Sequence, residues 1–153
     1  MSAETRKLAE VFSYLFVLAQ RMEYITDTFL KKDDLTTKQL LTLLAIGNAF
    51  ELAPSVSEVA DVLSTSHQNV KQIALNLEKR GFVKIVKDPT DGRRKLLRLT
   101  EANDKFWEAR EKENYDNMKK LFSTLNKKEV DEFHRLLLKS LTGIQGLYKE
   151  IRR

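Results

Sequence analysis

The stretch that decides the fold is "SHQNVKQIALNLEKRGFVKIVKDPTDGRRKLLRLT", which runs from Ser66 to Thr100. In its first half, apolar residues recur at the i, i+3, i+4 and i+7 spacing of a helix with one buried face. Ser66 is a preferred N-cap, and Gly81 stands where helices commonly end. The first half therefore predicts a helix. Its inward residues are Val70, Ile73, Ala74 and Leu77.

The second half predicts a β-hairpin. The runs 82–87 and 95–100 are rich in residues that favour strands. Between them, Pro89 is pre-set for a turn, and Asp91 and Gly92 are residue types that tolerate a positive φ. A turn needs only its turn residues, so the cations that follow it require another explanation. These cations are Arg93, Arg94 and Lys95.

Two shorter helices are predicted upstream, between residues 35 and 63. The first, in "LTTKQLLTLLAIGNAF", has Thr36 or Thr37 as its cap, and the second, in "SVSEVADVL", has Ser55 or Ser57. The polar turn "STS" separates the second from the helix that starts the opening stretch. A short helix, a tight turn, another helix and a two-stranded hairpin make a winged helix-turn-helix. The expected fold class is mainly α (α+β), with the hairpin as a wing.

Long helices are predicted at both ends of the chain. The segment from Thr5 to about Lys31 has no Gly or Pro and carries an apolar seam at three- and four-residue steps, with a second apolar face that predicts burial on two sides. "TEANDKFWEAREKENYDNMKKLF" predicts one continuous helix that starts near Thr100 or Glu101. A last helix is capped by Asn126 and has one apolar face. The second apolar face of the first helix consists of Tyr14, Phe16 and Val17.

Composition excludes several classes of protein. The 153 residues are 42% hydrophobic, enough to bury a core. There are 0 Cys and 2 His, so we expect no disulfide, no metal site and no cofactor. Catalytic triads, paired carboxylates and phosphate loops are not visible, and an enzyme is therefore not expected. The most apolar segment, Val11 to Ala19, is too short to span a bilayer, which favours a cytoplasmic protein.

The positive charge is concentrated in the opening stretch. Residues 64–100 contain nine basic and three acidic residues, a net charge of +6, whereas the rest of the chain has 18 basic and 19 acidic residues. Such a local cluster is typical of a polyanion site, because phosphate contacts dominate nucleic-acid affinity. A solvated basic face is the alternative that charge alone leaves open.

The outward face of the predicted 66–81 helix carries side chains that suit DNA. Glutamine and asparagine pair with adenine, so we expect Gln68, Asn69 and Gln72 to read A·T pairs and lysines to contact phosphates. Leu75 fits neither role; a thymine methyl or a neighbouring helix is its expected contact. The predicted recognition residues are Ser66, His67, Gln68, Asn69, Lys71, Gln72, Asn76 and Lys79.

The same reasoning explains the cations after the turn. In a winged helix the hairpin tip reaches the minor groove beside the recognition helix, and a narrow minor groove attracts arginine. We therefore expect Arg93, Arg94 and Lys95 to contact DNA. Asp91 is expected to hold the turn and to orient Arg93 through a charge-assisted hydrogen bond.

Four segments occur in the order and at nearly the spacing of a known family: "LTTKQLLTL", "SVSEVADVLSTSHQNVKQIALNLEKRGFV", "DPTDGRRKLLRLTEA" and "LNKKEVDEFHRLLLKSL". On these segments, most of the chain resembles a MarR-type transcriptional regulator. The resemblance places Asp91 and Arg93 on the family's minor-groove Asp-x-Arg motif. It implies one MarR-like domain over residues 1–153, with a DNA-binding lobe at 35–100 and a helical dimerisation region at 5–34 and 101–153.

The resemblance also implies what the protein binds. It predicts a homodimer on a pseudo-palindromic A/T-rich operator in double-stranded DNA, acting as a repressor at the nucleoid, and tuned by an anionic or phenolic small molecule. Arg21 is the candidate effector contact; a salt bridge at the surface or between subunits is its alternative role. The expected dimer contacts are Leu8, Val11, Phe12, Leu15, Leu137, Leu141, Ile144, Leu147 and Tyr148.

One competing function uses the same fold. A winged helix can serve as a protein-interaction module whose basic face binds an acidic partner. Such a module predicts no salt-sensitive DNA binding, and it leaves the polar face of the 66–81 helix without a role.

Overall fold

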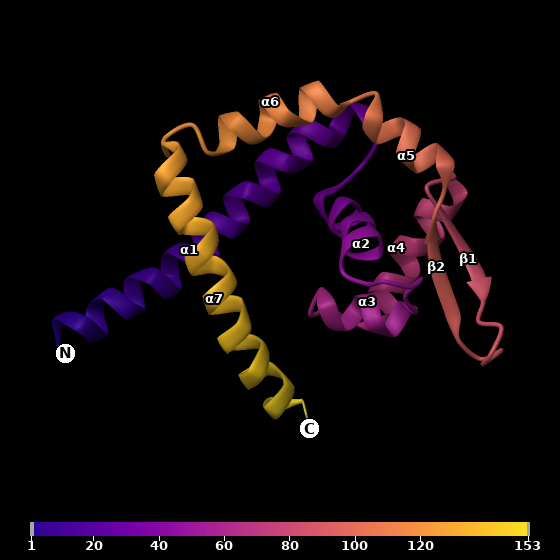
Figure 1. Cartoon of the computed structure of the whole chain (residues 1–153), viewed down its shortest axis with the longest axis horizontal. Coiled ribbons are helices and arrows are strands. Elements are labelled where there is room, and N and C mark those ends of the chain that lie inside the picture. The colour runs from indigo at the N-terminus through magenta and orange to yellow at the C-terminus, as the bar shows by residue number, and fades with distance from the viewer. Residues whose placement is uncertain (1, 153) are drawn as a thin grey trace. The chain divides into compact units, whose positions relative to one another are not determined.

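A computed structural model describes residues 2–152 of the chain as helices joined by short loops, with one β-hairpin (Figure 1). This arrangement confirms the expected fold class, a winged helix-turn-helix with long helices at both ends. The elements are α1 (Ala3–Leu30), the 3-10 turn η1 (Lys31–Asp33), α2 (Thr37–Asn48), α3 (Val56–Val62), α4 (His67–Lys79), β1 (Val83–Lys87), β2 (Lys95–Leu99), α5 (Glu101–Glu108), α6 (Glu111–Leu121) and α7 (Lys127–Ile151).

Local hydrogen bonds show which residues cap the helices, including α2 and α3, for which the sequence allowed two caps each. Thr36 caps α2, Ser55 caps α3 and Asn126 caps α7, each in a capping box with the glutamine or glutamate three residues later. Ser66 caps α4 by accepting from the backbone N–H of Asn69. At the other end of α4, Gly81 has a φ of +79°, a conformation that glycine adopts at little cost.

The core of the winged lobe lies between α2, α3, α4 and the hairpin. Val70, Ala74 and Leu77 of α4 are fully buried, as predicted, and Ile73 is half-buried against the same core. Leu97 of β2 is also fully buried in this cluster. Because the apolar side of α4 is used in this way, its polar side must face solvent.

The hairpin is antiparallel and is tied to the start of α3. Val83 pairs with Leu99 and Lys87 with Lys95 at its two ends. The N–H of Leu97 donates to the carbonyl of Pro54 (2.8 Å), and Ser55 forms an isolated bridge with Leu96. The wing is therefore joined to the helix-turn-helix by backbone pairing as well as by the core.

The prediction of one continuous helix after residue 100 is wrong. The helix is interrupted at residues 109–110, which separate α5 from α6. Arg110 turns inward, where it pairs with Asp33 of η1 and lies over the Phe106 ring. Both partners of this ion pair are largely buried. No Gly or Pro stands at the break, so the local sequence does not predict it. The break follows from the contact of Arg110 with Asp33, which lies 77 residues earlier.

The turn of the hairpin also differs from the expectation in one respect. Asp91 and Gly92 are residue types that tolerate positive φ, but neither adopts it. The N–H of Arg94 instead donates to the carbonyl of Asp91 (2.9 Å) in a turn that any residue can make.

The chain divides into two compact units, one up to Glu111 and one from Lys112 onward. In the first unit, α1 exposes Leu8, Val11 and Phe12 by more than half, so the burial predicted for this helix on two sides does not occur within a single chain. In the second unit, α7 exposes Leu141, Ile144 and Leu147 to a similar degree. Within residues 2–152, no helix combines the length and apolar character needed to cross a bilayer.

We predict that Leu77→Ala lowers the free energy of unfolding by about 2–5 kcal/mol, because it leaves a cavity where α4 meets the hairpin. The measurement is urea unfolding at a fixed protein concentration. Leu52→Ala is the matched control; its side chain is 85% exposed, and the change should stay within about 0.5 kcal/mol. Equal effects in the two variants would contradict the described core.

Candidate nucleic-acid interface

The outward face of α4 is polar and accessible. Gln68, Lys71, Gln72, Asn76 and Lys79 are all exposed, as expected for residues opposite the buried face. Leu75 is 36% exposed among them. The helix therefore presents glutamines, an asparagine, lysines and one apolar side chain on a single surface.

Two residues predicted to contact DNA, Ser66 and Asn69, form hydrogen bonds within the protein at the start of α4. The Ser66 hydroxyl accepts from the backbone N–H of Asn69 (3.1 Å), and the Asn69 side-chain amide donates to the Thr65 hydroxyl (2.9 Å). Within residues 2–152, the side chains of Gln68 and Gln72 make no hydrogen bond. The glutamines are therefore available for a ligand, whereas Ser66 and Asn69 organise the helix start.

The wing loop is organised by Asp88, which is nearly buried. One carboxylate oxygen of Asp88 accepts from the backbone N–H and the hydroxyl of Thr90 (2.8 and 2.7 Å) and from the N–H of Asp91 (3.3 Å). The Asp88 N–H donates to the carbonyl of Arg94 (3.1 Å), which closes the loop across its base. The short segment from Asp88 to Arg94 is thus a defined structure.

Asp91 holds the turn, but not in the way the sequence suggested. Its carboxylate accepts from the backbone N–H of Arg93 (3.0 Å). In the part of the chain that the structure describes, no ion pair joins Asp91 to the Arg93 guanidinium. The expected charge-assisted bond is therefore replaced by a backbone bond, and Arg93 has an exposed, unpaired side chain.

Arg94 is placed differently from its neighbour. Its guanidinium donates to Glu58 in the first turn of α3 (3.1 Å) and lies 3.5 Å from the second carboxylate oxygen of Asp88. Sequence reasoning missed Glu58. The motif "SVSE" announces it as a capping residue of α3, but nothing local announces its ion pair with a residue 36 positions away.

These contacts lower the pKa of both carboxyl groups. The pKa of Glu58 is lowered mainly by hydrogen bonds from the Ser55 backbone and side chain, with a further contribution from Arg94. The pKa of Asp88 is lowered mainly by hydrogen bonds from Thr90, then by one from the Asp91 backbone and by the positive charge of Arg94. Both groups are therefore ionised in the folded protein at neutral pH.

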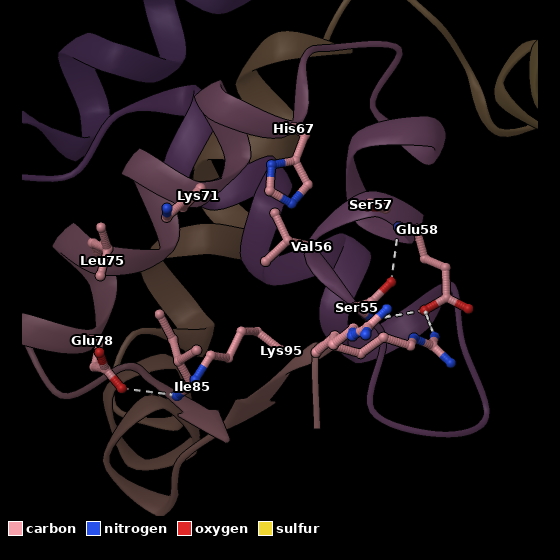
Figure 2. Close-up of a pocket in the computed structure, with 12 residues that line it drawn as sticks. Ser55, Val56, Ser57, Glu58, His67, Lys71, Leu75, Glu78, Ile85 and Lys95 are labelled. Atoms are coloured by element: carbon pink, nitrogen blue, oxygen red, sulfur yellow. Dashed lines mark hydrogen bonds and ion pairs between the residues drawn. The ribbon is translucent and has the colours of Figure 1, made fainter. Parts of the chain in front are cut away.

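A cavity of about 770 Å³ lies between the start of α3, α4 and the wing. Figure 2 shows His67, Lys71 and Leu75 on its α4 side and Lys95 on its wing side. Arg93 and Arg94 line it as well, together with Glu58 and Glu78. Glu78, a second residue that the sequence did not single out, accepts from the N–H of Ile85 (2.9 Å).

The fold thus gathers part of the predicted site in one place. His67 and Lys71 meet the wing residues Arg93, Arg94 and Lys95 around the cavity, whereas Asn76 and Lys79 do not line it. Gln68 and Gln72 do not line the cavity either, although both are exposed on α4. The exposed glutamines together with the cations around the cavity suit an anionic polymer with base edges that can be read.

Comparisons with known proteins give a consistent result. Residues 33–94 match the sequence model of the MarR family, and no curated protein sequence matches the chain. Among solved structures, the complex of MepR from S. aureus with DNA is 27% identical, with a TM-score of 0.69 over 86% of this chain and 97% of that chain.

Two further solved structures are similar in fold. A Cys-to-Ser mutant of MarR from E. coli in complex with operator DNA is 23% identical, with a TM-score of 0.75 over 92% of this chain and 99% of that chain. The transcriptional regulator SlyA is 16% identical, with a TM-score of 0.77 over 92% and 98%. At these identities the likeness concerns the fold alone.

We predict that the stability of the protein falls in acid partly through Asp88. Its lowered pKa means that the folded state binds fewer protons than the unfolded state, so the stabilisation is fully present above the unfolded pKa of about 4 and is lost as the pH falls further. Asp88→Asn should therefore flatten the dependence of the melting temperature on pH between pH 7 and 3.

Glu51→Gln is the control for this measurement, because Glu51 is exposed and makes no ion pair within the described chain. It should keep the wild-type pH dependence. An Asp88→Asn curve parallel to that of the wild type would contradict the role given to this carboxylate.

Proposed function

We propose that this chain, which carries the winged helix-turn-helix of the MarR family, is a sequence-specific DNA-binding transcriptional regulator that acts as a homodimer. The observation that carries the proposal is the accessible polar face of α4 beside the unpaired Arg93 of the wing. The solved complex of MepR with DNA, a protein of similar fold, supports it.

On this proposal, α4 lies in the major groove and the wing reaches the adjacent minor groove. Gln68 and Gln72 read adenine edges, Lys71 and Lys79 bind phosphates, and Arg93 enters the minor groove. Because glutamine suits adenine and a narrow minor groove is typical of A-tracts, the operator is A/T-rich. The net charge of +6 over residues 64–100 supports a polyanionic partner.

The homodimer is inferred from the apolar surface of the terminal helices. α1 and α7 each expose a row of large apolar side chains, and contiguous surfaces of this kind mark protein interfaces. A second copy covers them and places two winged lobes on a pseudo-palindromic site. The dimer residues we propose are Leu8, Val11, Phe12, Leu15, Leu137, Leu141, Ile144, Leu147 and Tyr148.

Regulation extends the same proposal. We infer a repressor acting at the nucleoid, with an anionic or phenolic effector that binds near Arg21. The Arg21 side chain is exposed on α1 and makes no ion pair in residues 2–152. Titration of wild type and Arg21→Ala with salicylate-like acids, followed by release of bound DNA, tests this role.

We predict that Arg93→Ala weakens binding to the best selected DNA site by about 1–3 kcal/mol and reduces the preference for A·T pairs. DNA fragments are first selected with the purified protein, and binding is then followed by fluorescence anisotropy over a salt series. Lys105→Ala removes a cation that is paired with Glu101 on α5, and it should bind like wild type. If no DNA sequence is enriched, an acidic protein partner becomes the better hypothesis.

We predict that Ile144→Glu converts the protein into monomers, because it places a charge in the apolar face of α7. Sedimentation velocity measures the mass, and the variant should lose affinity for the full operator. Lys139→Glu, on the opposite side of α7, should remain dimeric. A wild-type protein that sediments as a monomer would contradict the proposed assembly.

A further inference from the structure

We propose that Arg94 is a positioning residue that clamps the wing to the start of α3, so that Arg93 is the arginine of the pair that enters DNA. The inference rests on the proposed function. The sequence analysis expected both arginines to contact DNA, with Arg93 on the minor-groove motif. The inference gives Arg94 a different role, which is to hold the wing.

The clamp joins two elements through one guanidinium. Glu58 accepts from the Ser55 N–H (2.7 Å) and from Arg94 (3.1 Å) with the same carboxylate oxygen, so it caps α3 and holds Arg94 together. The other end of the guanidinium lies 3.5 Å from Asp88, at the end of β1. The positive charge of Arg94 is thus shared by two carboxylates within the protein.

The backbone of Arg94 is fixed as well. Its carbonyl accepts from the Asp88 N–H, and its own N–H donates to the Asp91 carbonyl. A little further along β2, Leu97 and Leu96 pair with Pro54 and Ser55, immediately before α3. The clamp therefore continues the attachment of the wing to α3 out to the base of the loop that carries Arg93.

Arg93 has the opposite character. Both arginines line the cavity between α4 and the wing, but in the described residues no carboxylate pairs with the Arg93 guanidinium. An unpaired cation can form new bonds with DNA without first breaking internal ones, whereas Arg94 would have to leave Glu58 and Asp88. The geometry thus favours Arg93 as the inserted side chain.

Neutralising Glu58 tests the clamp, because the clamp and simple electrostatics predict opposite changes in DNA affinity. Removing a negative charge from a DNA-binding surface should strengthen binding, and Glu78→Gln, in the same cavity, should do so by about 2-fold. Glu58→Gln keeps an oxygen that can cap α3 but loses the ion pair with Arg94. We expect it to weaken binding by about 3- to 10-fold, because the wing loses its fixed position.

A double-mutant cycle measures the coupling between two substitutions in DNA affinity, which a general loss of stability would not change. If Arg94 acts through Arg93, then Arg93→Ala costs less affinity in the Glu58→Gln background than in wild type. Arg94→Lys should bind more tightly than Arg94→Gln, since lysine can still pair with one carboxylate. Glu58→Gln that binds as tightly as wild type, or more tightly, overturns the proposal.

Amide hydrogen exchange separates this proposal from the proposed function, because it needs no DNA. Residues 88–94 should exchange faster in Glu58→Gln than in wild type, and at the wild-type rate in Glu78→Gln. Unchanged exchange in Glu58→Gln overturns the clamp. If wild type binds no DNA sequence specifically, the proposed function fails, while the exchange result still decides whether Arg94 holds the wing.

Discussion

The burial of one side of α4 is the constraint on which the rest of the lobe depends. Val70, Ala74 and Leu77 have no accessible surface, and they pack in one core with Leu97 of the hairpin. Because this packing fixes the rotation of α4, the glutamines and lysines on its other side must face outward. The same core holds the hairpin beside the helix. One set of packing contacts therefore fixes both the rotation of α4 and the position of the wing.

Electrostatics then assigns roles to the side chains at the edge of this core. Within the basic stretch 64–100, Asp88 pairs with Arg94, and Glu78 and Asp91 accept from backbone N–H groups. Glu58, which lies outside this stretch on α3, also pairs with Arg94. Among the cations that line the cavity, Lys71, Arg93 and Lys95 have no ion pair within residues 2–152. Arg94 is paired within the protein, whereas Arg93 is unpaired in the described residues and can bind an anion.

Local signals allowed most of the fold to be predicted from the sequence. Capping residues and the apolar period located the helices, and the helix-turn-helix and wing followed from their order. What failed was set by distant contacts: Arg110 breaks the helix after residue 100 because Asp33 draws it inward, and Arg94 meets Glu58 across 36 residues. The residues predicted to contact DNA share the exposed side of α4, but Ser66 and Asn69 form hydrogen bonds at the helix start, which no periodicity reveals.

We propose that α4 and Arg93 read adjacent grooves of one DNA site, and that a dimer does so twice. Footprinting of a selected site tests it most directly, with dimethyl sulfate for the major groove and hydroxyl radicals for the minor groove. We expect two protected major-groove segments about one helical turn apart, each flanked by a protected minor groove that becomes accessible in Arg93→Ala. Uniform protection, or protection of a single groove that Arg93→Ala does not change, would contradict it.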